Sequence, residues 1–347
     1  MPATSIDMFF ACTLVVSVAL IATAFLAGTM QTQINSMQDL NKQDYLQTIA
    51  DHIVSSYGTP VDWGSTSGVP ANFGLSASNS AGLFELDVDK ISRLSSQNEY
   101  SLSYLEVSRA ARLNNIAFGV SLSQMMSIGV ELSGTSTLGD VTTYAFTFSV
   151  RQDSGPLIAD LHCYVVARDS ISSVSNVTSS SGVCSISVEI PNSSSGLAML
   201  VVFARASFDD RMTAFEVYPF AHLSTEPSPN RTFLRLSPMN YSLTINPNFL
   251  EATVENGFAF SYDYQLNLTS TSSTTYAIPR ILDKSPVVLV VQGVNGTSPF
   301  VEWVSYPQLP LDVGADFKNS EENVFVYPVT INGALYKLTL RFGDVIN

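Results

Sequence analysis

Residues 8–30 read MFFACTLVVSVALIATAFLAGTM, a run of 23 residues without a charged side chain. A helix of about 20 apolar residues spans the roughly 30 Å hydrocarbon core of a bilayer. The run is too long for the apolar core of a signal peptide, and it lacks the ending that signal peptidase usually cuts. It therefore predicts a membrane-spanning helix. The first basic residue is Lys42, so the charges give no clear orientation across the membrane.

The helix is expected to continue past the apolar run. Residues 29–57 contain neither Pro nor Gly, and Gly58-Thr59-Pro60 then predicts the end of the helix. Apolar side chains recur at helical spacing, at Ile34, Met37, Leu40, Tyr45, Ile49 and Ile53. We expect one helix within residues 1–57, of about 50 residues and about 75 Å. Its amphipathic second half must pack against the globular part or against copies of the same helix.

Composition excludes several classes of function. The chain has 347 residues, of which 30 are acidic and 16 basic, for a net charge of −14. Charged residues make up 13% of the chain, about half the usual share, and 74 Ser and Thr residues supply polarity instead. Phosphate backbones repel such a chain, so we expect no nucleic-acid partner. A hydrophobic content of 46% excludes global disorder.

Residues 58–115 predict a small helical collar after the long helix. The segment opens with Gly, Pro and Ser, which indicate turns. Short helices are expected over residues 87–94 and 100–113, where apolar side chains return at helical spacing. Trp63 is interpreted as a packing anchor rather than a ligand platform.

From residue 116 onward the pattern changes to the period of two that is typical of strands. Short Val-, Tyr-, Phe- and Thr-rich segments separated by turns predict β-sandwiches. The Pro- and Ser-rich residues 223–230 suggest a boundary between sandwiches at 116–222 and 230–347. The expected strands include residues 141–150, 161–167, 185–190, 197–204, 233–245, 258–268, 287–291 and 336–342. The expected fold class is mainly β with a long N-terminal α-helix and two Ig-like β-sandwich domains.

Asp7, just before the apolar run, has two interpretations. One is a carboxylate at the level of the lipid headgroups. The other comes from a resemblance to type IV pilins, which carry an acidic residue about five positions into the mature chain, then an apolar helix, an amphipathic extension and a β-rich head. The resemblance implies that Asp7 compensates the N-terminal amine of a neighbouring subunit, because a buried charge is tolerated only when paired. It also places Met8, Phe9 and Phe10 in the core of a filament.

Three motifs follow the helix in a recognisable order. They are S-S-x-G-T-P-x-D-W-G at residues 55–64, P-x-x-F-G-L at 70–75 and L-D-x-D-K-I-x-R-L at 86–94. Together with the Asp-containing apolar helix they resemble archaeal membrane-anchored, pilin-like envelope proteins, which implies an archaeal source and a surface location. Only four residues precede Ser5, and none is basic. Cleavage after Pro2 would make Asp7 the fifth residue, and an unprocessed N-terminus is the alternative.

Residues after 116 carry the signals of an exterior location. Cys163 and Cys184 lie in expected strands on either side of a 20-residue loop, and we expect a disulfide between them. Two free buried thiols are the alternative, and Cys12 is interpreted as an apolar packing residue. N-x-S/T sequons, which arise by chance in Ser-rich chains, are confined to the chain after residue 170, and this suggests glycosylation. They are Asn176, Asn192, Asn230, Asn240, Asn267 and Asn295.

The sequence contains no catalytic signature that we recognise. The three histidines form no pair with zinc spacing, and the G-x-S-x-G, P-loop and G-x-G-x-x-G patterns are absent. We therefore expect no enzymatic activity, metal or cofactor. Region 116–222 also has a strand order similar to the stalk and adhesin repeats of microbial surfaces.

The resulting hypothesis is a structural cell-surface protein. It would be inserted in the membrane before assembly and then become a pilin-like subunit, major or minor, of a type IV pilus-like archaeal filament. Its copies would assemble through their N-terminal helices and display the β-sandwiches for adhesion. The alternative is a non-polymerising, membrane-anchored envelope protein that binds an S-layer or another surface ligand. A surface enzyme with a carbohydrate-directed site in the second sandwich is a third, weaker hypothesis.

Overall fold

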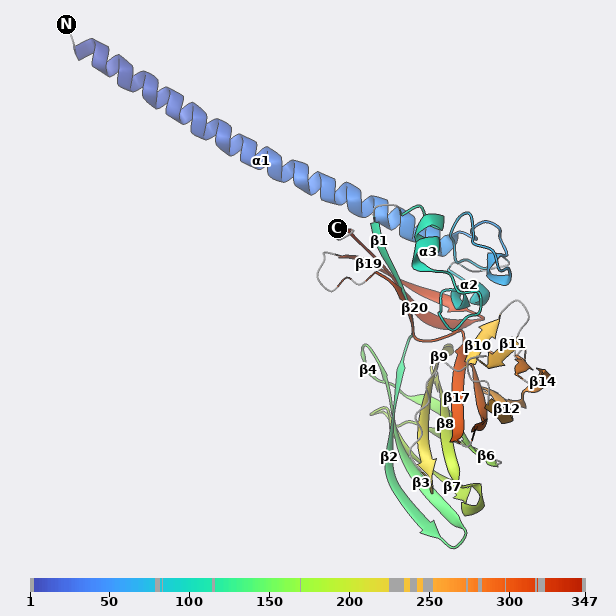
Figure 1. Ribbon diagram of the computed structural model, residues 1–347. Coiled ribbons are helices and arrows are strands. Elements are labelled where there is room, and N and C mark those ends of the chain that lie inside the picture. Colours follow the sequence, from blue (N-terminus) through green and yellow to red (C-terminus); the bar gives the residue numbers. More distant parts are fainter. Residues whose placement is uncertain are drawn as a thin grey trace. The chain divides into compact units, whose positions relative to one another are not determined.

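The protein divides into two units, Met1–Asp51 and His52–Asn347, which we describe separately. The computed structural model (Figure 1) describes residues 3–78, 82, 84–113, 116–168, 170–224, 234–237, 242–245, 252–272, 274–279, 283–296, 298–315, 317 and 322–344. The predicted mainly β fold with an N-terminal helix is confirmed.

Helix α1 (Ala3–Ser55) is continuous, as its sequence predicts. Beyond its end, Gly58 adopts a φ of +73°, a conformation that side chains disfavour. A Cβ at Gly58 would also lie 2.7 Å from the carbonyl oxygen of Asn72, so this position requires glycine. Of the predicted amphipathic stripe, the side chains of Ile34, Met37 and Leu40 lie outside the described residues. Tyr45 is exposed and Ile53 is buried.

Three of the antiparallel sheets described in the second unit are the outer, central and C-terminal sheets, built from strands between residues 127 and 306. The outer sheet contains β2 (Ser127–Leu138), β3 (Val141–Gln152), β4 (Gly155–Pro156) and β7 (Val183–Pro191). The central sheet has the order β6 (Ser170–Val177), β5 (Ala159–Ala167), β8 (Gly196–Ala206) and β9 (Asp209–His222). The C-terminal sheet has the order β13 (Tyr264–Asn267), β12 (Ala252–Ser261), β16 (Val287–Asn295) and β17 (Ser298–Tyr306).

Two further sheets complete the β structure. The small sheet has the order β10 (Leu234–Ser237), β11 (Ser242–Ile245), β15 (Thr275–Ala277) and β14 (Thr269–Ser272). The collar sheet has the order β18 (Leu311–Gly314), β1 (Ile116–Gln124), β20 (Ala334–Asp344) and β19 (Glu322–Ile331). Short 3₁₀ turns occur at η1 (Trp63–Ser65) and η2 (Asn192–Ser194).

The middle strands of the central sheet, β5 and β8, are buried on both faces. The inner face of this sheet shares one apolar core with the outer sheet, where Cys163 and Leu200 meet Phe146 and Ile186. These two layers form a β-sandwich. On the other face of β5, Tyr164 stacks on Phe260 of β12 with ring centroids 4.9 Å apart. A strand covered on both sides needs apolar residues at every position, which explains the nearly continuous apolar sequence of β8.

The two-domain, Ig-like arrangement predicted for residues 116–222 and 230–347 is not confirmed. β1 pairs along its whole length with β20, from Ile116 opposite Asp344 to Gln124 opposite Tyr336. It also pairs with β18. The expected division therefore places β1 on one side of the boundary and its hydrogen-bonding partners on the other. Sequence periodicity identifies strands but carries no information about which distant strands pair.

Three segments differ from their expected structure. The Ser-rich stretch read as a loop between Cys163 and Cys184 contains strand β6, which pairs with β5 along its length. β6 is an edge strand of mostly hydroxyl side chains, so backbone pairing holds it without an apolar alternation. Residues 258–268, expected as one strand, form the hairpin of β12 and β13. For residues 233–245 the structure describes two strands, β10 and β11, in place of the single one expected.

The collar contains both predicted helices in shorter form, α2 (Val88–Ser92) and α3 (Tyr104–Ala110). Trp63 is fully buried, and its indole Nε1 donates to the Gly74 carbonyl at 3.0 Å. This agrees with its interpretation as a packing anchor. The Asp87 side chain accepts hydrogen bonds from the first backbone N–H groups of α2, as expected for a helix N-cap.

Two buried cations fasten the collar. The Arg93 guanidinium donates to the carbonyls of Trp63, Gly68 and Tyr100 at 2.5, 2.9 and 2.9 Å. Lys90 Nζ donates to the carbonyl of Ser76 at 2.7 Å and to that of Tyr57 at 3.0 Å. Burial lowers the pKa of both groups. Each cation joins chain segments that have no regular secondary structure to hold them together.

Gly64 tests how tightly this arrangement is packed. A Cβ at Gly64 would lie 2.6 Å from the Lys90 backbone nitrogen, whereas a Cβ at Gly68 would meet nothing within 4 Å. We expect Gly64→Ala to lower the free energy of unfolding by about 1–3 kcal/mol, the usual effect of overpacking. Gly68→Ala is the matched control and should leave it unchanged. Urea unfolding followed by tryptophan fluorescence measures both, and equal stabilities of the two variants would contradict the prediction.

Candidate functional site

The first candidate site is the apolar part of α1, Met8–Gln31, which is long and apolar enough to cross a membrane. Met8, Phe9 and Phe10 are exposed, and so are the other described side chains of this segment. Nothing is described of the Asp7 side chain, so its predicted role lies outside the described residues.

The hydroxyl groups in this segment are satisfied within the helix. Thr13 donates to the Phe9 carbonyl at 3.0 Å, and Ser17 donates to that of Thr13 at 2.8 Å. Thr23 and Thr29 bond in the same way to carbonyls three or four residues earlier. Polar groups in an apolar environment need such internal partners, since neither lipid nor apolar side chains can supply them. The segment is therefore chemically suited to a water-free environment.

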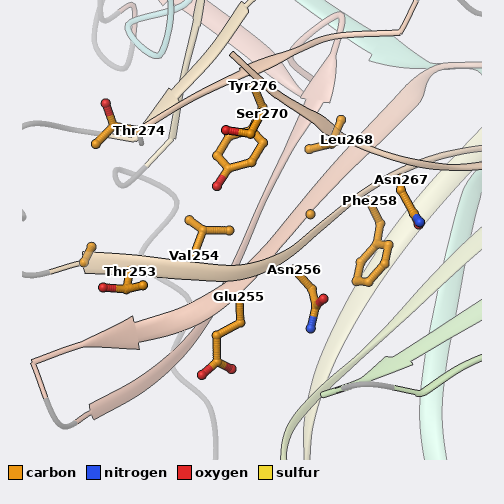
Figure 2. A pocket seen from close by; sticks show the side chains of 12 residues that line it. Thr253, Val254, Glu255, Asn256, Phe258, Asn267, Leu268, Ser270, Thr274 and Tyr276 are labelled. Atoms are coloured by element: carbon orange, nitrogen blue, oxygen red, sulfur yellow. The ribbon is translucent and has the colours of Figure 1, made fainter. Parts of the chain in front are cut away.

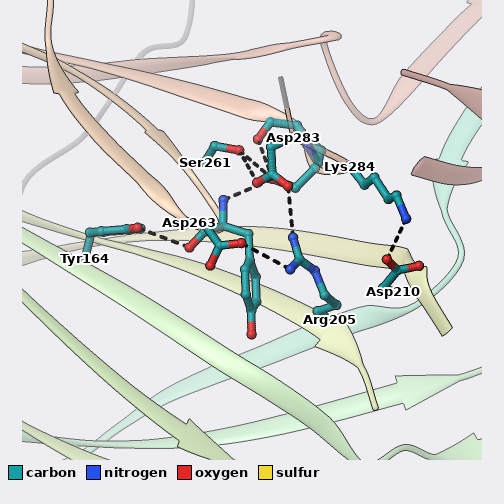
Figure 3. A network of polar contacts seen from close by, with 10 residues as sticks. Tyr164, Arg205, Asp210, Ser261, Asp263, Asp283 and Lys284 are labelled. Carbon is teal, nitrogen blue, oxygen red and sulfur yellow. Dashed lines mark hydrogen bonds and ion pairs between the residues drawn. The ribbon is translucent and has the colours of Figure 1, made fainter. Parts of the chain in front are cut away.

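The second candidate is a polar network between the central and C-terminal sheets (Figure 3). Arg205 of β8 donates to Asp283 at 3.0 Å and to Asp263 at 3.2 Å. Its guanidinium carbon lies 3.8 Å from the centroid of the Tyr262 ring. The Asp283 carboxylate also accepts from Ser261 at 2.8 Å. The network pairs Arg205 with Asp283, which the packing of the two sheets largely shields from water, whereas Asp263 stays exposed.

The network has features of structural rather than reactive groups. Tyr164 donates its hydroxyl to the Tyr262 carbonyl at 3.1 Å. Burial, with the nearby Asp263 and Asp283, raises the pKa of Tyr164 to about 12, so the hydroxyl stays protonated. The bonds described for Ser261 go to Asp283 and to another serine hydroxyl, and none goes to a histidine. The sequence gives no sign of this network, because its members are separated by up to 119 positions.

A cleft of about 770 Å³ lies between β12 and the small sheet. Figure 2 shows Val254 on the side of β12 that faces Tyr276 and Ser270, whereas Glu255 and Asn256 extend from the other side. Among the described residues of the lining, Glu255 supplies the one carboxylate. The polar groups do not converge on one point, so this cleft has no evident arrangement for acid–base chemistry.

The histidines have separate surroundings. His162 stacks on Tyr164 with centroids 4.5 Å apart, on the face of β5 opposite to Cys163. His222 is buried at the end of β9, between the Tyr144 hydroxyl at 2.9 Å and the Pro191 carbonyl at 3.0 Å. Within the described ranges, no three His, Cys, Asp or Glu side chains are placed to hold a metal ion.

The two cysteines of the sandwich lie on facing sheets. Cys163 of β5 is in the core, and Cys184 of β7 packs against that core. Both are free thiols in the structure. Burial, and secondarily the neighbouring Cys184, raises the pKa of Cys163. The fold therefore places Cys163 and Cys184 at one core, and the disulfide between them stays a prediction.

The sequons differ in their surroundings. Asn267, at the end of β13, is exposed, as is Asn176 of β6. Asn192 is half-buried: its Nδ2 donates to the Gly139 carbonyl at 3.1 Å, and its Oδ1 accepts from Thr142 at 2.7 Å. Asn230, Asn240 and the side chain of Asn295 lie outside the described residues.

Comparisons with known proteins identify no family. No family model matches the chain, and no characterised protein of related sequence was found. Among solved structures, the chain is similar to human GIVD cytosolic phospholipase A2, with 7% identity, 67% of this chain covered and a TM-score of 0.16. The match spans 33% of that protein's chain. A TM-score this low carries no argument about fold or activity.

Disulfide formation is tested on protein isolated from cells without reductant. Closing a loop of about 20 residues should contribute roughly 3 kcal/mol to stability. We expect mass spectrometry after alkylation in denaturant to find a peptide linked through Cys163 and Cys184, and Cys12 to be alkylated. Reductant should then lower the melting temperature of the wild type but not that of Cys184→Ser. Alkylated Cys163 and Cys184 in the unreduced sample would show that the thiols are free.

The sequon environments predict unequal glycosylation. In protein from a glycosylating host, we expect a glycan on Asn267, because its side chain is exposed to a transferase. Asn192 should stay mostly unmodified, because its amide nitrogen is already held against Gly139. Site-resolved glycopeptide mass spectrometry measures the occupancy, with Asn267→Gln as the control for assignment. Higher occupancy at Asn192 than at Asn267 would contradict the prediction.

Proposed function

We propose that the protein is a structural cell-surface protein, a pilin-like subunit of an archaeal type IV pilus-like filament. The N-terminal helices of neighbouring copies would form the filament core after insertion in the membrane. The β sheets would be displayed on the outside for adhesion. The single observation that carries the proposal is helix α1, which is uninterrupted over 53 residues although its membrane-length apolar segment needs only 24.

The exposed apolar side chains support assembly through this segment. A helix that is apolar all round requires either lipid or other apolar helices around it. Thr13, Ser17 and Thr23 bond within the helix, so either environment leaves no hydroxyl unsatisfied. The continuous extension beyond Gln31 supplies a second stretch along which copies would pack. A simple anchor requires no such extension.

Two properties of the protein distinguish the proposed assembly from simple anchoring: its location in the cell and its N-terminal residue. We expect sheared surface filaments from the native host to contain the protein, with Met1 absent and Ala3, Thr4 or Ser5 first. N-terminal sequencing and electron microscopy measure this. Protein that stays in the membrane fraction with an intact or merely Met-trimmed N-terminus would support the alternative, a non-polymerising envelope protein that binds an S-layer or other surface ligand.

Substitution of Asp7 gives the sharper test. Asp7→Ala should abolish filaments while the protein still accumulates in the membrane, because an unpaired amine would then be buried in the filament core. Asp44→Ala is the matched control, since Asp44 is an exposed carboxylate on the same helix. Filaments should be retained in that variant. Normal filaments from Asp7→Ala would contradict the pairing role.

A further inference from the structure

The second half of β2 is an open edge of the outer sheet. β2 pairs with β3 from Ser127 opposite Arg151 to Leu138 opposite Val141, and no other strand among the described residues pairs with it. Residues 133–138 are all exposed, Leu138 at 88%. β9 lies near β2, but no backbone pairing joins the two in the described part of the chain. Figure 1 shows β2 along one side of the sheet, ending at the hairpin with β3.

The turn between β2 and β3 identifies which backbone groups are open. It is a two-residue turn at 139–140, whose glycine has a φ of +61°, so Leu138 and Val141 are the first hydrogen-bonded pair of the hairpin. Hydrogen-bonded and non-hydrogen-bonded pairs alternate along an antiparallel ladder. Thr137 and Thr135 therefore direct their N–H and C=O groups away from β3, toward solvent.

Two observations agree with this assignment. Thr137 Oγ1 lies 3.0 Å from Thr142 Oγ1, and side chains approach most closely in non-hydrogen-bonded pairs. On the other side of β3, Val141 lies opposite Pro191 of β7. Proline has no N–H to donate, which suits a position where the hydrogen-bonding groups of Val141 point to β2 instead. The open groups of Thr135 and Thr137 therefore fit the geometry of the whole sheet.

Proteins usually protect such an edge with proline, charged side chains, a short strand or a covering layer. Other edge strands of this chain have these devices: β19, β17 and β9 contain Pro328, Pro299 and Pro219. β6 and β7 lie against each other, where Asn176 donates to the Ser185 carbonyl at 2.9 Å. β10, β13, β14 and β18 are edge strands of four residues. In contrast, residues 132–139 read LSGTSTLG and contain neither proline nor a charge.

A second copy of the chain matches this edge. In an antiparallel arrangement about a twofold axis, the donors of one strand face the acceptors of the other, so one open edge is complementary to itself. Copies of a chain with a net charge of −14 repel each other. At the uncharged stretch 132–139, two backbones approach without placing like charges opposite each other.

The open groups also define a register. With Thr135 opposite Thr137 of the second copy, both residues donate and accept, and Ser136 lies on the twofold axis. The paired stretch is then 134–138, which follows the bulge of β2 between Leu132 and Gly134. The nearest charged side chains of the strand and the turn, Glu131 and Asp140, lie beyond the paired stretch.

We propose that residues 134–138 of β2 pair antiparallel with the same residues of a second copy, so that the outer sheet continues from one copy into the other. One such pairing is short and weak, and many copies on one surface strengthen it through multivalency. The site lies wholly within the unit His52–Asn347. It goes beyond the proposed filament function and does not depend on it. A protein that fails to form filaments would still pair through β2, so the two proposals fail separately.

Cysteine cross-linking tests the pairing at its axis. Opposite residues of a non-hydrogen-bonded pair have Cα atoms about 4.5 Å apart, which a disulfide can bridge. The full-length protein carries Cys12→Ser, because Cys12 is exposed on α1. In detergent and under mild oxidation, we expect Ser136→Cys to form a disulfide-linked dimer. Ser187→Cys is the matched control, since Ser187 is exposed on the same sheet but lies on β7. Non-reducing gels should show several-fold more dimer for Ser136→Cys, with the linkage mapped to position 136 by mass spectrometry.

Proline substitution tests whether backbone pairing makes the contact. Thr135→Pro removes an N–H that faces away from β3, so it should keep the β2–β3 ladder and block the dimer. Thr135→Val keeps that N–H and is the matched control. Added to Ser136→Cys, proline should lower cross-linking several-fold and valine should not, with melting temperatures near that of the parent. Equal cross-linking of Ser136→Cys and Ser187→Cys, or full cross-linking with Thr135→Pro, would each overturn the proposal. The first comparison decides even where the proline variant is unstable.

Discussion

Burial of both faces of β5 and β8 in the central sheet constrains the arrangement of the second unit. The inward residues of β5 and β8 require the outer sheet, and the outward residues require a second apolar layer. The C-terminal sheet supplies that layer, through contacts such as Tyr164 on Phe260 and Phe215 on Trp303. The same C-terminal sheet is covered in turn by the small sheet, which shares a core with it. Each layer is therefore stable only because the next one excludes water from it.

Within the described residues, the cations that are wholly or partly shielded from water have polar partners. Arg205 enters the interface between the central and C-terminal sheets with two carboxylates, Asp263 and Asp283. In the collar, Lys90 and Arg93 are satisfied mainly by backbone carbonyls instead. The carbonyls fix the path of an irregular chain segment around each cation. The Asp87 carboxylate, 3.9 Å from Lys90 Nζ, supplies an opposite charge as well. This explains why a motif rich in turns forms a well-packed collar.

The unsatisfied groups stand out against this pattern. Most buried polar side chains named above have partners, but both amide atoms of Gln308 have none in the described residues. The apolar segment Met8–Gln31 of α1 lacks a packing partner, because the rest of the chain does not bury its side chains. The exposed apolar segment requires lipid or further apolar helices around it.

Local pattern was sufficient for much of this structure. Residues 8–57 predicted the continuous helix, because helical hydrogen bonds are local and no Pro or Gly interrupts them. The burial of Trp63 was also predictable, as were β3, β5, β7 and β8. The hydroxyl-rich strand β6 was missed because it has no apolar alternation.

Only the tertiary structure decided which strands pair and which faces meet. Nothing local in residues 116–124 indicates that they pair with residues 336–344, because β pairing depends on complementarity between distant segments. The Arg205 network has the same origin, since it brings together residues that are far apart in sequence. The sequence alone determined the elements and the apolar helix, whereas folding determined every site at which side chains from different elements converge.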